Sequence, residues 1–212
     1  MSSLKVLYLH PPMRLGSSDY PFIPMGVVGL LNLLIEDGHE VNAINLPLEQ
    51  SMNPSLDLEA LLKQYEFDLV LIDLHWYVSS SGAIDLACLC HRLNPNCKVC
   101  LGGITATCFD IEIMHYCRSV DFIIRGDAEL PIRMLCNLLS AHRPDYKEVP
   151  NLTYRKQNQI VRSKHFYRIK PKEFNRLNYA DISWLAHWRE YLKTDIEGFA
   201  QHNPSQFWLE VG

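Results

Sequence analysis

Apolar residues along the first 145 positions follow two spacings: short continuous runs, and longer segments in which they recur at helical intervals. The continuous runs predict strands buried on both faces, and the helical spacing predicts helices packed against them. The expected strands are residues 5–9, 40–46, 68–74, 99–101 and 120–124. The expected helices are residues 25–37, 57–65, 83–93, 111–117 and 129–141.

Five strands that alternate with five helices predict an α/β fold of the flavodoxin-like or Rossmann-like class, with a doubly wound, five-stranded parallel sheet in the order 2-1-3-4-5. Ligands of such sheets bind beyond the carboxyl ends of the strands. Gly102 and Gly103 follow the fourth strand directly and leave bare backbone at this edge, which a large ligand can approach. The alternative explanation is a tight turn that needs a positive φ and holds no ligand.

The pattern changes after residue 145. Residues 152–155 and 160–163 flank a polar turn and predict a β-hairpin, and residues 180–193 predict an amphipathic helix. A strand-like run follows at residues 207–211. We therefore expect an α/β domain over residues 1–145, then a hairpin, linker and helix over residues 146–212. The apolar stripe of that helix would fold back on the α/β domain or pair with a second copy of the chain.

Composition narrows the class of protein. Apolar residues make up 48% of the chain, the net charge is −4, and no leader sequence or long apolar span is visible. These values predict a cytoplasmic globular protein that contacts neither nucleic acid nor membrane. An odd count of seven cysteines argues against a disulfide framework. Cys97 and Cys100 have the spacing of a metal half-site, but alternation along a strand predicts that they face opposite ways.

The loop after the first strand excludes several cofactor sites. Its residues, HPPMRLG, lack the glycines of a dinucleotide site or a phosphate-binding loop, and they lack the carboxylates of a response-regulator receiver. Ser17 and Ser18 lie too far along the loop to favour a flavodoxin-type phosphate site, and no nucleophile motif indicates hydrolysis. His10 and His75 are the histidines of interest, because both follow central strands of the expected sheet.

Five segments in register resemble a known family. They read KVLYLHPP, PMGVVGLLNLLIEDGHEVNAINL, LGGITAT, VDFIIRGDAELPIRMLCNLL and VPNLTYRKQNQIV. In this order they are similar to the N-terminal cobalamin-binding domain of cobalamin-dependent radical S-adenosylmethionine proteins, and the similarity covers residues 4–165. The resemblance implies a cobalamin whose nucleotide tail lies in a slot beside the sheet, with Gly102 and Gly103 forming one wall.

The resemblance also places cofactor contacts on the loops at the carboxyl ends of the strands. The expected contact residues are His10, Pro11, Pro12, Asp73, His75, Trp76, Tyr77, Ser79, Gly102, Gly103, Thr105, Arg125, Gly126, Asp127 and Glu129. Two positions depart from the family pattern. Asp73 stands where a hydroxyl residue is common, and Ile104-Thr105 stands where Pro-His is common.

A histidine ligand to cobalt is not expected. Modules that bind cobalamin with a histidine ligand carry D-x-H-x-x-G after the first strand, and this loop has no such motif. Residues 37–39 read DGH, but Asn42 replaces the glycine and the stretch precedes the second strand, at the opposite edge of the sheet. The resemblance therefore implies base-off cobalamin without a histidine ligand. Water or a loop residue would face the cobalt, and the candidates are His10, Trp76 and Tyr77.

The radical domain of such proteins begins with C-x-x-x-C-x-x-C, which binds a 4Fe-4S cluster and S-adenosylmethionine. No such spacing occurs in this chain, so we expect no metal site here and a partner radical domain in a longer parent chain. The chain would then be a non-catalytic fragment that presents cobalamin for methyl transfer or a cobalamin-assisted rearrangement. The alternative is a ligand-free flavodoxin-like domain with an interaction or regulatory role.

Overall fold

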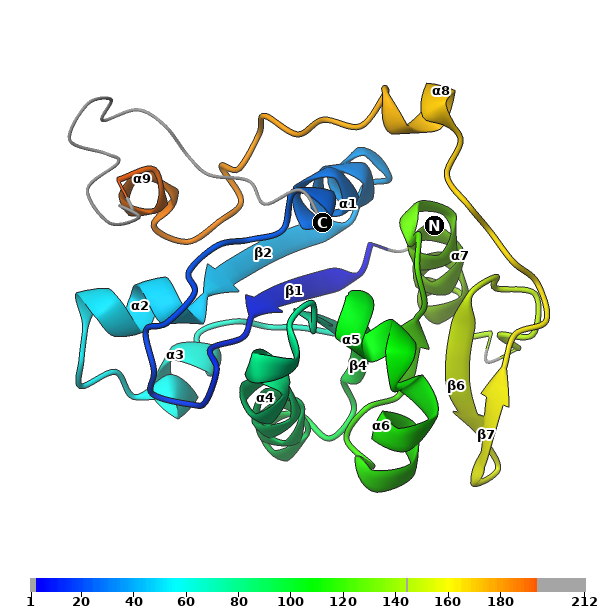
Figure 1. The fold of residues 1–212 in the computed structure, drawn as a ribbon, viewed down its shortest axis with the longest axis horizontal. Coiled ribbons are helices and arrows are strands. Elements are labelled where there is room, and N and C mark those ends of the chain that lie inside the picture. Colours follow the sequence, from blue (N-terminus) through cyan, green and yellow to red (C-terminus); the bar gives the residue numbers. More distant parts are fainter. Residues whose placement is uncertain (1–2, 144, 194–212) are drawn as a thin grey trace.

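Within residues 3–143 and 145–193, which the computed structural model describes, seven strands form one mixed sheet in the order β2-β1-β3-β4-β5-β6-β7 (Figure 1). The strands are β1 Lys5–His10, β2 Glu40–Asn45, β3 Leu69–Asp73, β4 Lys98–Gly102, β5 Phe122–Ile124, β6 Leu152–Lys156 and β7 Gln159–Arg162. The first five are parallel, and the hairpin β6–β7 joins them antiparallel to β5.

The predicted order of the five parallel strands is present, but the expected strand count is wrong. Residues 152–162 do not form a separate hairpin, because β6 pairs with β5, with Phe122 opposite Tyr154 and Ile124 opposite Leu152. A bare β5 edge would leave backbone N–H and C=O groups unpaired, and β6 satisfies them. The expected domain boundary at residue 145 stays a prediction, and the hydrogen bonds between β5 and β6 span it.

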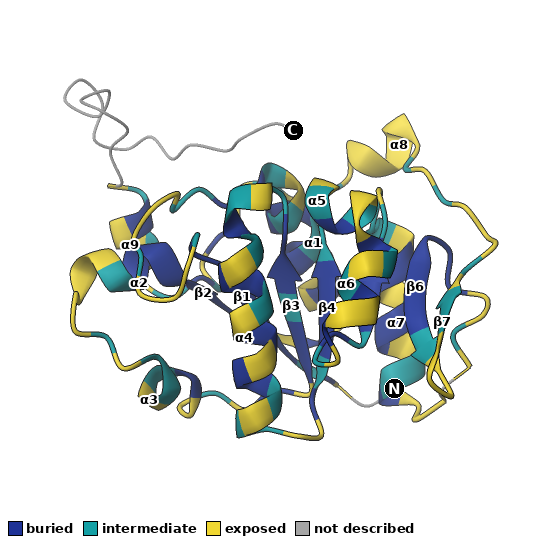
Figure 2. Ribbon diagram, turned by 60° about the horizontal axis from the view of Figure 1, so that its bottom comes forward, coloured by how far each residue is buried: buried dark blue, intermediate teal, exposed yellow. Residues whose placement is uncertain are grey.

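Helices cover both faces of the sheet (Figures 1 and 2). They are α1 Met25–Glu36, α2 Leu46–Met52, α3 Leu58–Leu62, the 3-10 turn η1 Tyr77–Ser79, α4 Ser80–Leu93, α5 Ile104–Cys108, α6 Asp110–Tyr116, α7 Glu129–Ser140, α8 Pro171–Phe174 and α9 Trp188–Tyr191. Helices α1 and α7 pack on one face, and α3, α4 and α6 pack on the other. The sequence prediction missed the short helices α2, α5 and α8.

Strict alternation along the strands divides the core into two layers. Leu7, Val70 and Leu101 point toward α4, whereas Tyr8 and Phe122 point toward α1 and α7. Cys97 and Cys100 fall in different layers, which confirms that they face opposite sides of the sheet. Burial raises the pKa of the Cys97 thiol to about 11, so it stays protonated near neutral pH.

Residues 180–193 do not form the single amphipathic helix that the sequence predicts. Only α9 is helical, because the preceding residues pair with the open edge of β2. Ala43 donates its N–H to the carbonyl of Trp184 (3.2 Å) and accepts from Ala186 (2.8 Å). The side chain of Asn32 fixes the same segment by donating to the carbonyls of Asn178 and Asp181, 2.8 Å each.

This packing covers the apolar stripe with the chain's own domain. Ile182, Leu185 and Tyr191 are buried in a cluster with residues of β1 and α1, and Trp184 and Trp188 pack against its rim. Self-association through this segment stays a prediction. The expected strand at residues 207–211 lies outside the described residues. Within those residues, no helix combines the length and apolar character needed to cross a bilayer.

Candidate functional site

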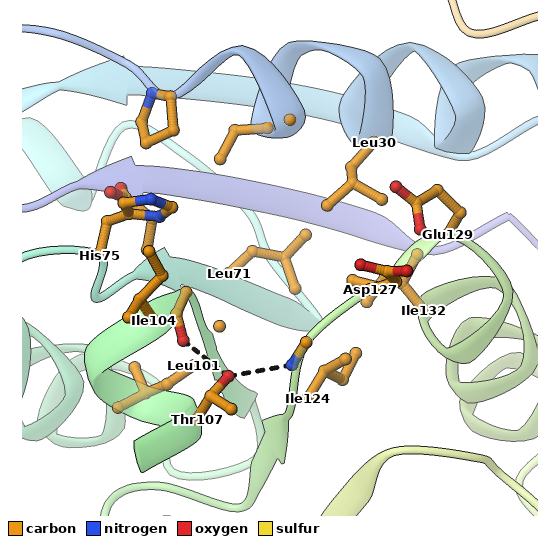
Figure 3. Close-up of a pocket in the computed structure, with 18 of the residues that line it drawn as sticks. Leu30, Leu71, His75, Leu101, Ile104, Thr107, Ile124, Asp127, Glu129 and Ile132 are labelled. Carbon is orange, nitrogen blue, oxygen red and sulfur yellow. Dashed lines mark hydrogen bonds between the residues drawn. The ribbon is translucent and has the colours of Figure 1, made fainter. Parts of the chain in front are cut away.

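A cavity of about 490 Å³ opens between the sheet and the helices α1, α5 and α7 (Figure 3). The apolar part of its lining includes Leu30 of α1, Leu71 of β3, Ile124 of β5 and Ile132 of α7. The loops that follow β3, β4 and β5 form its rim, so it lies at the carboxyl ends of the central strands. This is the edge at which open parallel sheets bind ligands, and the volume suits a small-molecule site.

The glycine pair contributes two different features to this cavity. Gly103 has φ +101°, and a Cβ there would lie 2.7 Å from the carbonyl oxygen of Leu74, so the turn requires glycine. Gly102 has ordinary backbone geometry, and the nearest atom to a Cβ there would be 4.0 Å away. Gly103 therefore makes the turn, and Gly102 supplies the bare wall. The positive φ that the turn interpretation predicts is present at Gly103, and ligand contact at Gly102 stays a prediction.

Helix α5 joins three loops at the rim. Thr105 donates its hydroxyl to the carbonyl of His75 (2.9 Å), which ties α5 to the loop after β3. Thr107 donates its hydroxyl to the carbonyl of Gly103 (2.8 Å) and accepts from the N–H of Gly126 (2.9 Å), as Figure 3 shows. The expected site residues do not include Thr107. Its position four residues after Gly103, on one turn of helix, is the signal that identifies it.

A buried polar cluster of Tyr8, His10 and Asp73 links the ends of β1 and β3 beside the cavity. The hydroxyl of Tyr8 donates to Asp73 Oδ1 (2.6 Å), and His10 Nδ1 lies 2.9 Å from the same oxygen. His10 Nε2 lies 2.9 Å from the carbonyl oxygen of Tyr20. Both partners of the ring are acceptors, an arrangement that favours the imidazolium form of His10 paired with Asp73.

Burial alone would lower the pKa of His10, but the Asp73 carboxylate and the Tyr20 carbonyl outweigh burial and raise it. Burial also raises the pKa of the Tyr8 hydroxyl, which stays a donor to Asp73. The side chain of His10 is 1% exposed and has no free lone pair. His10 therefore links β1 to β3 and to the loop that leads to α1. Both ring nitrogens are engaged in these contacts, so neither is free to bind a metal.

The expected contact residues divide into two groups. Those that line the cavity are Asp73, His75, Gly102, Gly103, Gly126, Asp127 and Glu129. Those that do not are His10, Pro11, Pro12, Trp76, Tyr77, Ser79, Thr105 and Arg125. Two residues of the second group are packed against other parts of the protein. A Cβ at Gly82 would lie 2.0 Å from the carbonyl oxygen of Pro12, and Arg125 Nε lies 3.7 Å from Asp110 Oδ2. Their contact with a cofactor stays a prediction.

Apolar side chains are exposed on the same loops. Tyr77 is 77% exposed, Ile104 is 54% exposed and Tyr20 is 52% exposed. They lie after β3, β4 and β1 respectively, so they surround the carboxyl edge of the sheet. The rings of His75 and Trp76 meet edge to face beside them, with centroids 5.2 Å apart. A broad, partly apolar ligand could rest on this surface.

The end of the cavity near α7 is acidic. Asp127 Oδ2 accepts from the N–H of Ile169 (2.8 Å), and the Glu129 carboxylate lies near Leu30 and Asp127 (Figure 3). Burial raises the pKa of Glu129, as does the nearby Asp127. No lysine or arginine belongs to the described lining. A phosphate or other anion would therefore be unfavourable inside the cavity.

The segment after the hairpin also contributes to the cavity. Ile169 and Phe174 line it, although the sequence predicts a linker that leads away from the domain. Hydrogen bonds between Asn151 and the backbone of Tyr167, 2.8 and 3.0 Å long, hold the start of this segment. Nothing in the local sequence around Ile169 indicates this role, because it depends on the antiparallel attachment of the hairpin.

Two curated proteins are similar to the chain over 168 residues. One is the anaerobic magnesium-protoporphyrin IX monomethyl ester cyclase of Synechocystis sp., which is 27% identical, with 74% of this chain and 32% of that protein covered. The other is an uncharacterized methyltransferase of Pyrococcus horikoshii, which is 26% identical, with 76% and 34% covered. The chain thus spans about a third of the length of these relatives.

Solved structures show the same fold at low sequence identity. The radical S-adenosylmethionine methyltransferase TsrM of Kitasatospora setae, with cobalamin and a [4Fe-4S] cluster bound, matches with a TM-score of 0.62 and 18% identity over 80% of this chain and 30% of that one. The cobalamin-dependent S-adenosylmethionine radical enzyme OxsB, with aqua-cobalamin and S-adenosylmethionine bound, matches with a TM-score of 0.61 and 14% identity over 79% and 23%.

The family model of the B12 binding domain matches residues 13–135, which is more than half of the chain. The match begins in the loop after β1 and ends within α7, so it includes every strand that borders the cavity except β1. It also includes both glycines of the β4 turn, Asp73 and Glu129. The resemblance seen in the sequence is confirmed: the chain belongs to the B12 binding domain family.

Proposed function

We propose that the chain is a cobalamin-binding module that holds the nucleotide tail of the cofactor in the cavity and the corrin ring over the carboxyl edge of the sheet. The observation that carries this proposal is the cavity itself, with the open wall at Gly102. A flat heteroaromatic base matches its apolar floor, and the exposed Tyr77 and Ile104 offer contact to a macrocycle above it.

The residues present are compatible with such a ligand. The uncharged base can enter a lining without cations, whereas the phosphate of the tail would remain at the rim. The hydroxyls of Thr105 and Thr107 and the N–H of Gly126 already donate within the protein, so they fix the loops at this rim and are not free to bind the phosphate. When bound, cobalamin would supply the alkyl-transfer or rearrangement chemistry, and the protein would supply orientation and exclusion of water.

The cobalt is proposed to lack a histidine ligand. Both nitrogens of His10 are engaged, and His39 lies at the other edge of the sheet, where its Nδ1 accepts from the N–H of Leu4 (3.3 Å). Water or a loop residue such as Trp76 or Tyr77 would then face the metal. Electron paramagnetic resonance of the Co(II) form tests this. We expect no nitrogen splitting, and a splitting that disappears in His10→Ala, His39→Ala or His75→Ala would contradict it.

The larger protein context is also a proposal. Relatives of which the match covers about a third, together with the fold shared with TsrM and OxsB, support a module that serves a radical S-adenosylmethionine domain. That domain would bind the 4Fe-4S cluster and S-adenosylmethionine, since this chain has no C-x-x-x-C-x-x-C spacing. The reaction would be methyl transfer or a cobalamin-assisted rearrangement, in the cytoplasm and without nucleic acid or membrane as partner.

A single experiment separates this function from a ligand-free interaction domain. The purified chain is incubated with cobalamin, desalted, and examined by visible absorption spectroscopy. Retention of the corrin bands at close to one equivalent is expected. A folded chain that releases all corrinoid on desalting would favour the interaction domain instead.

A further inference from the structure

Two residues of the cavity lining come from outside the α/β layers. Ile169 and Phe174 belong to residues 163–186, which follow β7, form α8 and run back over α1 (Figure 1). We call residues 163–186 the strap. The match to the family model ends at residue 135, so both side chains lie beyond it. The cavity is therefore completed by a part of the chain that the family match does not include.

Hydrogen bonds anchor the strap on both sides of α8. Before α8, the N–H of Ile169 donates to Asp127 Oδ2 (2.8 Å). After α8, the side chain of Asn32 on α1 donates to two carbonyls of the strap, 2.8 Å each, and accepts from Trp184 Nε1 (2.9 Å). The two anchors lie on different elements of the α/β domain, so they fix the ends of the intervening span independently.

The span between the anchors is held weakly. Residues 170–177 make no hydrogen bond to any described residue outside the strap, and the bonds of α8 stay within it. Residues 170–176 are all exposed. The ring of Phe174 meets the ring of Tyr179, also on the strap, with centroids 5.4 Å apart. A span with so few contacts to the domain opens locally at a lower free energy than the sheet does.

Phe174 is only partly covered where it lines the cavity. It is 41% exposed, whereas Phe166, which lies on the same strap outside the lining, is 83% exposed. An apolar ligand group in the cavity would cover more of the Phe174 ring, and this burial favours the closed strap. By linkage, the closed strap then favours the bound ligand.

We propose that the strap closes over the bound ligand with Phe174 as its contact residue, and that opening of the strap sets how fast the cavity exchanges its ligand. This inference rests on the proposed function, in which the ligand group is the nucleotide tail of cobalamin. When residues 170–177 move away, the lining loses Phe174 and the cavity opens further to solvent. A closing segment slows both entry and release, whereas a fixed contact residue slows release alone.

The first test changes the contact residue. Stopped-flow absorption measures the association rate constant of cobalamin with the purified chain, and desalting at timed intervals measures the dissociation rate constant. Phe174→Ala should raise the dissociation rate constant about tenfold, because an apolar contact is lost, and should raise the association rate constant as well. Phe166→Ala is the matched control, since this ring lies outside the lining, and it should leave both rate constants unchanged.

The second test changes an anchor that does not touch the cavity. Asn32 is outside the lining, and Asn32→Leu removes its hydrogen bonds to the strap. Both rate constants should rise about threefold, because the strap opens more often. If Asn32→Leu does not fold, as judged by circular dichroism, Trp184→Phe removes one bond to the same anchor and keeps a ring. Trp188→Asp, beyond this anchor on α9, should leave both rate constants unchanged.

The outcomes distinguish this inference from the proposed function. If the wild-type chain binds cobalamin but the association rate constant stays at its wild-type value in Phe174→Ala and in the anchor variant, the strap is a fixed wall. The inference is then overturned while cobalamin binding stands. If the folded wild-type chain binds no cobalamin, both proposals fail. A rise in both rate constants in Phe174→Ala and in the anchor variant, with both controls unchanged, supports the strap.

Discussion

At the scale of single residues, adjacent glycines at the end of β4 have separable roles. A Cβ at Gly102 would meet no atom closer than 4.0 Å, and Gly102 lines the cavity, so we expect the fold to tolerate a side chain that projects into the cavity. We predict that Gly102→Val retains its secondary structure and a free energy of unfolding within about 1 kcal/mol of wild type, and loses cobalamin on desalting. Urea unfolding and the visible spectrum after desalting measure the two effects.

Gly103→Ala is the matched comparison. Its Cβ would lie 2.7 Å from a backbone oxygen at a φ of +101°, so strain of about 1–3 kcal/mol should lower the free energy of unfolding. Cobalamin binding would then be lost only as far as the fold is lost. Full corrin retention by a well-folded Gly102→Val protein would refute the position of the tail.

His10 predicts a pH dependence whose sign follows from its raised pKa. The folded state binds the proton more tightly than the unfolded state, so the pair with Asp73 stabilises the fold fully below the unfolded pKa of about 6.5. The contribution is lost as the pH rises through the folded pKa. We expect the difference in free energy of unfolding between wild type and His10→Asn to be largest near pH 6 and to shrink above neutrality.

Urea titrations of both proteins between pH 6 and 9 measure this difference. Comparing the two proteins cancels other groups, such as His39, whose pKa burial lowers. Tyr8 also faces Asp73, but burial raises its pKa, so it does not ionise in this window. A difference that grows with pH would mean that His10 is neutral in the folded chain.

At the scale of elements, periodicity predicted the parallel strands and helices α1, α3, α4, α6 and α7, but not the short helices α2, α5 and α8. Helix α5 has five residues and depends on the turn at Gly103 and on hydrogen bonds to the loop after β3. Residues 180–193 show helical spacing, yet the open edge of β2 offered backbone partners and only α9 became helical. In both cases hydrogen bonds to segments distant in sequence determined the local structure, and local sequence patterns do not predict such contacts.

The residues of the candidate site were likewise predicted only in part. The strand pattern predicts which edge of the sheet carries the site, and the family resemblance places contacts at Asp73, Gly102 and Glu129, all of which line the cavity. Their contact with a cofactor stays a prediction. Tyr8 was missed because strand alternation cannot say that its hydroxyl reaches Asp73 on the neighbouring strand. Ile169 and Phe174 were missed because their position depends on where the hairpin attaches.

One ion-pair cluster holds that hairpin on the sheet. Asp110 is 0% exposed, and its carboxylate accepts from the guanidinium of Arg162 on β7 and from the hydroxyl of Thr153 on β6. Removing Arg162 would leave a buried carboxylate with a weaker partner in Arg125, 3.7 Å away. We predict that Arg162→Leu lowers the free energy of unfolding by about 2 kcal/mol, less than a fully buried pair because Arg162 is half exposed.

Native-state hydrogen exchange should localise this effect. Amides of β6 and β7 are expected to lose protection before those of β1 and β3, because the cluster lies at the hairpin edge of the sheet. Lys156→Leu serves as control, since this lysine is exposed on β6. Uniform loss of protection across the whole sheet would indicate that the hairpin and the parallel strands unfold as one unit.

At the scale of the whole molecule, the segment after the hairpin closes the cavity and then covers the edge of β2. Ile169 of this segment donates to Asp127, and Phe174 lines the cavity. Tyr179 then lies against Gly29 of α1, and the following residues bond to Asn32 of α1 and Ala43 of β2. Within the described residues, the segment after the hairpin therefore packs along the face of the sheet that carries α1 and α7. A neighbouring domain would meet a surface already ordered by this contact.

The last prediction concerns the partner of the apolar stripe. The sequence allowed either fold-back or association with a second copy, and Leu185 and Tyr191 are buried against the chain's own core, at 2% and 3% exposure. Trp188 packs only partly, with the guanidinium of Arg189 4.3 Å from its ring centroid. Burying such a side chain within one molecule provides roughly 1.5–3 kcal/mol without a second copy.

We therefore expect Trp188→Asp to lower the free energy of unfolding by about 1–2 kcal/mol and to leave the sedimentation coefficient unchanged. Sedimentation velocity across a hundredfold range of protein concentration measures the second quantity, with Glu190→Gln, an exposed position of α9, as the control for the neighbouring surface. Cobalamin retention should also be unaffected, because Trp188 does not line the cavity. A wild-type sedimentation coefficient that rises with concentration, and a Trp188→Asp value that does not, would instead assign the stripe to a second copy of the chain.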